Sequence, residues 1–192
     1  MRDYLAPVCG MVAVFATALI LIVAGHHDTF DRHTTNLHPE LGEGDRIAAV
    51  HRAATGESAE ATSANLISSS SRAGRLIERF ANRVLFELQP DRSVPVLLSF
   101  GTFTRAGRKI VGIRQAADLV FGARVETLTD SEIALYCTWI VHGQAGWGPE
   151  EVISTREQVL ARLHRASIID EATWNRLNDA PLVIRPTPIP IY

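Results

Sequence analysis

Two short stretches of the sequence hold side chains that could take part in chemistry. The first contains Glu43, Asp45 and His51, and the second contains Arg75 and Glu78. A carboxylate is a common general base, and an arginine can stabilise a departing anionic group. Arg75 and Glu78 stand three residues apart, so on a helix their side chains are neighbours. The same spacing also suits an ordinary surface ion pair, and the sequence leaves both interpretations open.

A series of arginines surrounds the second stretch. Its spacings of three and four residues place the arginines on one helix face. There they could meet phosphates or anionic lipid head groups, or they could form a solvated face. The series consists of Arg72, Arg75, Arg79 and Arg83.

The thiols and imidazoles of the chain give little sign of a metal site. Cys9 and Cys137 are far apart in the sequence and cannot form the paired spacing of a zinc site. Cys9 lies in an apolar run, which makes a disulfide implausible, and we interpret both residues as buried, inert thiols. Four histidines lie in a polar segment without helical periodicity and are interpreted as solvated. They are His26, His27, His33 and His38.

The N-terminal segment predicts a membrane anchor. No charged residue occurs between Tyr4 and Gly25, and a helix over this run spans roughly 33 Å, against about 30 Å for the core of a bilayer. A cleaved signal peptide has a shorter apolar region, so an uncleaved single span is favoured over cleavage. With a short N-terminal tail in the cytoplasm, the body is expected on the periplasmic or extracellular side of the inner (plasma) membrane.

The body that follows is predicted to be mainly α-helical. Ile77, Ala81, Val84 and Leu88 recur at spacings of three and four, which predicts a helix over 75–88 with these residues on its buried face. Caps and stops predict the other helices. These run over 113–121 before Gly122, from Thr129 with Glu132 as a capping box to about Val141, from Pro149 to about Ala166, and onward from Asp170.

The remaining segments are expected to be irregular. The glycine-punctuated stretch 101–112 shows no strand alternation, and 55–74 is interpreted as a loop or weak helix because it is rich in small polar residues. Four regions are therefore expected. They are a transmembrane anchor over 1–25, a linker that includes the stretch with Glu43, Asp45 and His51 over 26–74, a helical domain over 75–181, and an extended Pro-rich tail over 182–192.

The composition excludes several classes of protein. The chain has 192 residues, a formal net charge of -2 and 46% hydrophobic residues. It is therefore too apolar and too nearly neutral for intrinsic disorder. The near-neutral charge also argues against a nucleic acid partner, because nucleic-acid-binding domains are usually strongly basic. The length suits one ordinary domain with an appendage.

A series of short motifs in the C-terminal half matches a family pattern in order and spacing. They are GIRQAADLVFG from Gly112, LTDSEIALYCTWI from Leu128, Pro149-Glu150, the arginine of STREQVLARL, and residues 168–171. On these motifs, residues 112–181 resemble the C-terminal lobe of the bacterial peptidoglycan glycosyltransferases of family 51. That family includes the transglycosylase modules of class A penicillin-binding proteins. The resemblance implies a lysozyme-like helical domain with one N-terminal transmembrane helix; the alternative is an unrelated helical domain with coincident caps.

The resemblance also implies a reaction. In this family the 4-hydroxyl of one lipid-linked disaccharide joins the anomeric carbon of a growing glycan strand, and a lipid pyrophosphate leaves. A carboxylate takes the hydroxyl proton. Arginine, lysine or a divalent metal ion stabilises the departing pyrophosphate.

Two family motifs carry the reacting groups, and the second falls on Arg75 and Glu78 of this chain. The family places this glutamate beside the pyrophosphate. By resemblance, Glu78 is therefore a catalytic candidate and Arg75 a substrate-binding candidate.

The first motif reads Glu-Asp-x-x-Phe-x-x-His in the family, and Gly44–His51 is its best match. Asp45 and His51 fall at the expected positions, but glycine stands where the catalytic glutamate would be. Glu43 lies one residue early. We expect Glu43 or Asp45 to be the catalytic base and His51 to bind substrate.

The sequence departs from the family between these motifs. Only residues 52–77 separate His51 from Glu78, and the family's Ser-Thr-x-x-Gln-Gln signature is absent. A missing general base costs on the order of 10²–10⁴-fold in rate. We therefore expect a weakened or inactive glycosyltransferase-like envelope protein that acts on or binds lipid-linked disaccharide precursor or a glycan strand. The alternatives are a non-catalytic module that binds precursor or a cell-wall synthase partner, and a membrane-anchored helical protein unrelated to wall synthesis.

Overall fold

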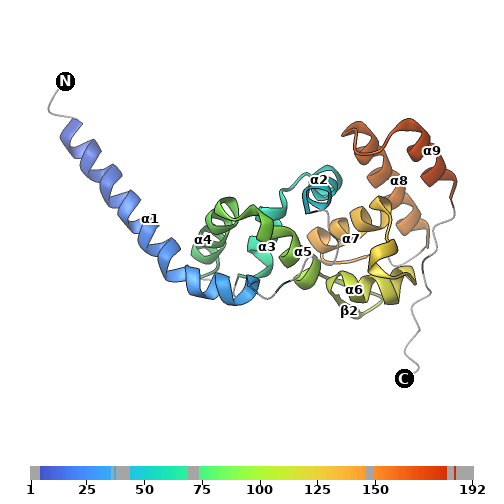
Figure 1. The fold of residues 1–192 in the computed structure, drawn as a ribbon, viewed down its shortest axis with the longest axis horizontal. Helices are drawn as coiled ribbons and strands as arrows, with labels where there is room; N and C mark the ends of the chain where they lie inside the picture. The colour runs from blue at the N-terminus through green and yellow to red at the C-terminus, as the bar shows by residue number, and fades with distance from the viewer. Residues whose placement is uncertain are drawn as a thin grey trace.

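The fold is mainly α, as the sequence predicts. The computed structural model describes residues 5–35, 37, 44–68, 74–145, 149–180 and 184, and leaves the side chains of 5–13, 15 and 149 outside the description. Within these ranges there are nine α-helices and one two-stranded hairpin (Figure 1). The α-helices are α1 Leu5–Thr34, α2 Gly44–Thr55, α3 Ala59–Leu66, α4 Arg75–Leu88, α5 Ser93–Phe100, α6 Gly112–Ala116, α7 Asp130–His142, α8 Pro149–Arg165 and α9 Glu171–Asp179. The strands are β1 Thr102–Arg105 and β2 Arg108–Val111, and the short helical turns are η2 Pro90–Arg92, η3 Ala117–Phe121 and η4 Val125–Thr127.

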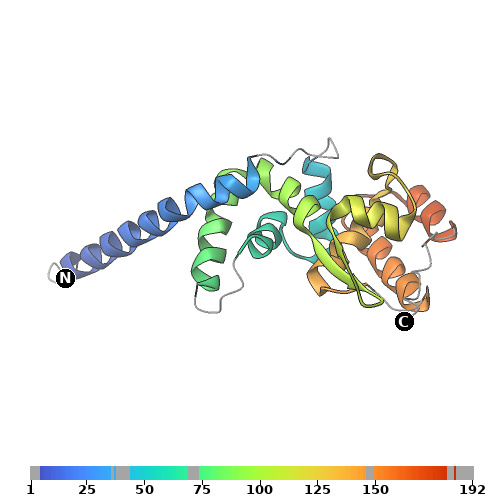
Figure 2. The ribbon, with the colours of Figure 1, turned by 90° about the horizontal axis from the view of Figure 1, so that it is seen from below.

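Helix α1 leads away from the rest of the molecule and joins it only through its last turns (Figures 1 and 2). There Phe30 is fully buried and meets the edge of Phe86 at 4.7 Å between ring centroids. Arg92 pairs with Asp31 and donates a hydrogen bond of 2.9 Å to the Thr34 hydroxyl. These contacts explain why the helix continues to Thr34, through a segment that the sequence analysis expected to be a linker.

No helix in the described part of the chain is both long enough and apolar enough to cross a membrane. The predicted anchor covers 4–25, and the description leaves out Tyr4 and the side chains of 5–13 and 15. The anchor therefore stays a prediction. The tail after Pro181 falls almost wholly outside the described residues.

Helix α7 is the centre of the main core. Helices α2 and α8 and strand β1 pack around it, and nearly every side chain from Ser131 to Ile140 is buried. Trp139 stacks on Phe121 at 5.7 Å between ring centroids and also contacts Phe103 at 5.3 Å. This tryptophan is core packing.

The hairpin corrects the prediction that 101–112 is irregular. Strands β1 and β2 pair antiparallel, with Phe103 opposite Ile110, and both of these side chains are buried. The turn places Ala106 and Gly107 at φ 46° and 76°, which is the left-handed pair that a tight hairpin needs. The hairpin leaves no clear alternation in the sequence, because each strand has only four residues and only one fully buried side chain.

The predicted caps of the C-terminal half are confirmed. Thr129 and Glu132 form a reciprocal capping box at the start of α7. Asp170 caps α9 by accepting a 2.7 Å hydrogen bond from the Thr173 amide. Gly122 ends the α6–η3 helix in the left-handed conformation, at φ 65°. Helix α8 begins at Pro149, as predicted.

Two helices lie in segments for which the sequence predicts no definite helix. Helix α3 lies in the small-residue stretch 55–74, where the Ser58 hydroxyl accepts a hydrogen bond from the Ala61 amide. Helix α5 contains the short apolar stretch 94–98. The two helices pack against each other, and the Ser63 hydroxyl donates a 2.6 Å hydrogen bond to the Ser93 carbonyl. Tertiary packing stabilises both, since helices this short are marginal alone.

Helix α4 has the predicted bounds but not the predicted buried face. Ala81, Leu85 and Phe86 are buried against α1 and α3, whereas Ile77 and Leu88 are exposed. Of the predicted stripe, Ala81 is therefore buried and Val84 half-buried, while Ile77 and Leu88 at its two ends face outward.

Candidate functional site

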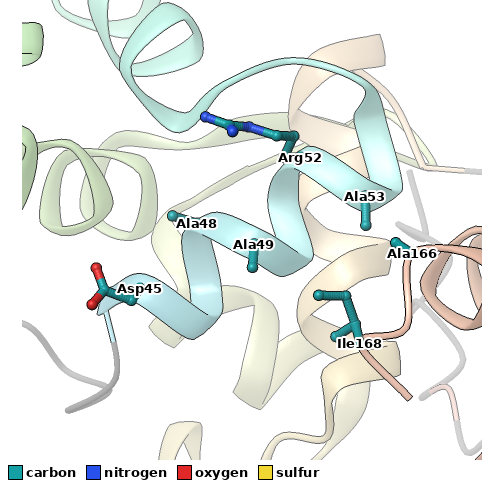
Figure 3. Close-up of a pocket in the computed structure, with 7 residues that line it drawn as sticks. All are labelled: Asp45, Ala48, Ala49, Arg52, Ala53, Ala166 and Ile168. Carbon is teal, nitrogen blue, oxygen red and sulfur yellow. The ribbon is translucent and has the colours of Figure 1, made fainter. Parts of the chain in front are cut away.

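Helix α2 lines a shallow hollow of about 400 Å³ that contains one of the predicted catalytic residues. Asp45 stands in the first turn of α2, and Arg52 lies two turns farther along (Figure 3). The floor between them is made of alanines, and the facing wall comes from the turn after α8 (Figure 3). The lining residues are Asp45, Ala48, Ala49, Arg52, Ala53, Ala166 and Ile168. One acidic and one basic residue therefore line the hollow, although the guanidinium of Arg52 extends away from Ile168 (Figure 3).

The other predicted carboxylates do not line this hollow. Glu43 lies outside the described residues. Glu78 stands in the first turn of α4, which packs on α1 and α3, whereas α2 packs on α7 and α8. The structure thus gives Asp45 a hollow that Glu78 does not share.

The structure places His51 inside the protein. Its side chain is fully buried between α2 and α3, and its Nε2 lies 2.9 Å from the Thr62 hydroxyl oxygen. That hydroxyl donates to Oε2 of Glu57 at 3.2 Å, so Nε2 of the imidazole is the donor to Thr62. Burial lowers the pKa of His51 to about 4, although the nearby acids Glu57 and Glu60 act to raise it. The histidine is therefore neutral at neutral pH and holds α2 against α3.

Arg75 and Glu78 lie one turn apart at the start of α4, as their spacing predicts. Both side chains are half-buried, and both make further polar interactions. Glu78 sits at the helix N-terminus, where the helix dipole favours a negative charge. The pair presents a guanidinium and a carboxylate side by side at the edge of the folded body.

A second, smaller hollow of about 170 Å³ lies between α3 and α4. Two arginines one turn apart, Arg79 and Arg83, form its α4 side together with Phe80. Ala61, Ala64 and Asn65 of α3 form the opposite side. The spacing of the arginine series identifies its α4 side in the sequence. Nothing in the sequence indicates that α3 faces it, because 55–74 was interpreted only as a loop or weak helix.

Arg156, from the motif STREQVLARL, has a structural role. It is 8% exposed and donates to the carbonyl oxygens of Leu177 and Ala180, so it caps the C-terminus of α9. Arg162 acts similarly on α2 through the carbonyl of Ala54. Both side chains hold neighbouring helices in place.

The described residues include one cysteine side chain, which is buried, and no cluster of possible metal ligands. Cys137 is buried in α7, and burial raises the pKa of its thiol to about 12, which confirms that it is inert. Cys9 falls outside the described side chains. Among the histidines, cysteines and acidic residues that the structure describes, no group of three could hold a metal ion.

The chain matches no model of a known protein family, and it matches no curated protein.

Proposed function

We propose that this chain is a peptidoglycan glycosyltransferase-like protein of the cell envelope that binds lipid-linked disaccharide precursor and polymerises it weakly or not at all. In this proposal the segment 4–25 anchors the chain in the inner membrane, with the body on the periplasmic side. The fold of 75–181 is then a divergent, lysozyme-like lobe.

The observation that carries the proposal is the position of Arg75 and Glu78. They stand side by side in the first turn of α4, at the edge of the body rather than in its core. The resemblance assigns this pair to the pyrophosphate of the lipid-linked precursor. An arginine at this position can form charge-assisted hydrogen bonds to phosphate oxygens.

The helix boundaries of the C-terminal half lend further support. The motifs behind the resemblance fall on α6 to α9, and their caps lie at the helix ends. Gly112 has a structural reason as well: its φ is 75°, and a Cβ there would lie 2.9 Å from the Ser99 carbonyl oxygen. The agreement between these motifs and the helix ends supports a helical framework shared with the family.

The arrangement favours binding over efficient catalysis. Gly44 stands where the family has its base, and Asp45 lines a hollow that does not include Glu78. His51, expected to bind substrate, is buried and engaged with Thr62. A non-catalytic module that binds precursor or a cell-wall synthase partner is therefore the second candidate, and one experiment separates the two.

The test measures binding and polymerisation on the same purified full-length protein in detergent. We expect fluorescent lipid-linked disaccharide to bind, and Glu78→Gln and Arg75→Gln each to change its affinity. For Arg75→Gln the expected loss is about 10- to 150-fold, because a hydrogen bond to a charged group contributes roughly 1.5–3 kcal/mol. Glu157→Gln, an exposed substitution on α8, is the matched control and should bind as the wild type does.

The outcomes divide the candidates. Slow polymer formation that Glu78→Gln abolishes supports a weakened enzyme. Binding without polymer supports the non-catalytic module. No binding by a well-folded protein contradicts the proposal as a whole.

A further inference from the structure

Helix α4 exposes a second apolar face that nothing in the described chain covers. Leu76 is 75% exposed and Leu88 70%, while Ile77 and Phe80 are each about half exposed. These side chains lie opposite the face that packs on α1 and α3. Single exposed apolar residues are ordinary on a protein surface, but several large ones clustered on one helix mark an interaction surface.

Arginines border this face on one side. Successive arginines at spacings of four advance by about 40° around the helix at 3.6 residues per turn. Arg79 and Arg83 therefore lie between the buried face, to whose side Arg75 belongs, and the exposed apolar face. Apolar side chains with a basic border are the pattern of helices that lie in a membrane interface.

The arginines also define where an anion would bind. Arg79 and Arg83 line the hollow between α3 and α4, beside the amide of Asn65. The Nε of Arg79 is sheltered from solvent and has no hydrogen-bond acceptor, and Arg79 has no carboxylate partner among the described residues. A phosphate oxygen in the hollow would supply the missing acceptor.

Arg83 remains available although it has a partner. Its Nε lies 3.1 Å from Glu87, but both side chains are more than half exposed. An exposed ion pair one turn apart on a helix contributes little to stability. A phosphate held jointly with Arg79 can therefore compete with Glu87.

Helix α1 exposes apolar side chains as well. Val14, Ile20 and Leu21 are 66–70% exposed, and the C-terminal end of α1 packs beside α4 (Figure 2). An apolar phase that receives both helices explains the two exposed surfaces together. This favours a lipid surface over a protein partner shaped for α4 alone.

We infer that α4 lies on the surface of a bilayer that contains anionic phospholipid. Leu76, Ile77 and Phe80 enter the boundary between head groups and acyl chains, and Arg79 and Arg83 bind a head-group phosphate in the hollow beside α3. This inference goes beyond the proposed function, because it requires no disaccharide precursor.

The test reports on α4 alone, so that attachment through α1 cannot imitate the result. An environment-sensitive fluorophore is placed on Leu76→Cys in the full chain that also carries Cys9→Ser; Cys137 is fully buried and stays unlabelled. Ile153→Cys, at an exposed apolar position of α8, is the matched control. The vesicles are phosphatidylcholine alone, or phosphatidylcholine with about one-third phosphatidylglycerol.

We expect the fluorescence at position 76 to shift to shorter wavelength on the phosphatidylglycerol vesicles, and the fluorescence at position 153 to stay unchanged. Replacing Arg79 and Arg83 by glutamine should weaken the partitioning of α4 by about fivefold per arginine, or roughly thirtyfold together. Arg108→Gln, an exposed arginine of β2, should leave it unchanged. Added salt should weaken the shift, because it screens the arginines.

Three results would overturn the inference. The first is a label at position 76 that stays in water on phosphatidylglycerol vesicles, whether or not the chain sediments with them. The second is an equal shift on phosphatidylcholine alone, which would mean that α4 does not recognise anionic phospholipid. The third is a shift in buffer accompanied by a doubled mass, which would mean that a second copy covers α4.

Discussion

Helices α7 and α4 differ in how far the protein covers their apolar side chains. Almost every side chain of α7 between Ser131 and Ile140 is buried, so the helix is enclosed on all sides by protein. Helix α4 is amphipathic, yet its large apolar side chains at Leu76, Ile77 and Leu88 face outward. Apolar periodicity therefore indicates a helix but does not say which apolar face the protein itself covers.

The largest expected effect compares one residue from each helix. Trp139→Ala removes a buried indole that stacks on Phe121, so we expect the free energy of unfolding to fall by about 3–5 kcal/mol. Leu76→Ser on α4 should change it by less than about 0.5 kcal/mol, because this side chain is already exposed. Urea denaturation of both variants makes the comparison. Similar losses in the two would mean that α4 is covered in solution.

A pH dependence should belong to the α2–α3 contact. Burial lowers the pKa of His51 from 6.5 to about 4, so the unfolded chain binds a proton in this range that the folded chain does not. The free energy of unfolding should therefore fall as the pH drops from about 6.5 toward 4, by up to roughly 3 kcal/mol.

His51→Gln keeps a donor toward Thr62 but cannot titrate. Denaturation curves across this pH range should be flatter for the variant than for the wild type. His164→Gln is the control, because His164 is only partly buried. Equal slopes for the wild type and His51→Gln would place the titration elsewhere.

Arg156 offers a third comparison, between helices α9 and α7. Arg156→Met leaves the carbonyl groups of Leu177 and Ala180 without their donor, which should cost about 1.5–3 kcal/mol. Hydrogen exchange should accelerate in α9 and remain slow in α7. Unchanged exchange in α9 would show that its C-terminus does not depend on this arginine.

The smallest effect concerns the cap of α7. Thr129→Ala removes one half of the capping box and should cost about 1 kcal/mol, measured as a shift in the urea midpoint. Glu132→Gln is the conservative partner, since glutamine can still reach back to the Thr129 amide. A Thr129→Ala protein as stable as the wild type would show that packing alone holds the start of α7.

The C-terminal half could be predicted because its signals are local. The capping box of Thr129, the Asp170 cap and the glycine stop at Gly122 each depend on residues within a few positions of one another. Such signals survive in a single sequence, and the structure confirms the helices that they predict.

The middle of the chain could not be predicted because its signals are tertiary. Helix α3 depends on α5 through contacts such as that between Ser63 and Ser93, and the hairpin depends on the burial of Phe103 against α7. The same limit applies to the candidate site. Spacing predicts that Arg75 and Glu78 are neighbours, but only the fold shows that His51 is buried and that Arg79 faces α3.

Helix α4 is proposed to bind the lipid-linked precursor and the bilayer surface, while the core of the protein is built around α7. The most direct measurement is hydrogen exchange of the full chain on vesicles that contain lipid-linked disaccharide precursor, compared with the chain in detergent alone. We predict slower exchange in α4, most strongly in its first turn around Arg75 and Glu78, with α7 and α8 unchanged. Unchanged exchange in α4 together with protection of α2 or α8 would contradict the account.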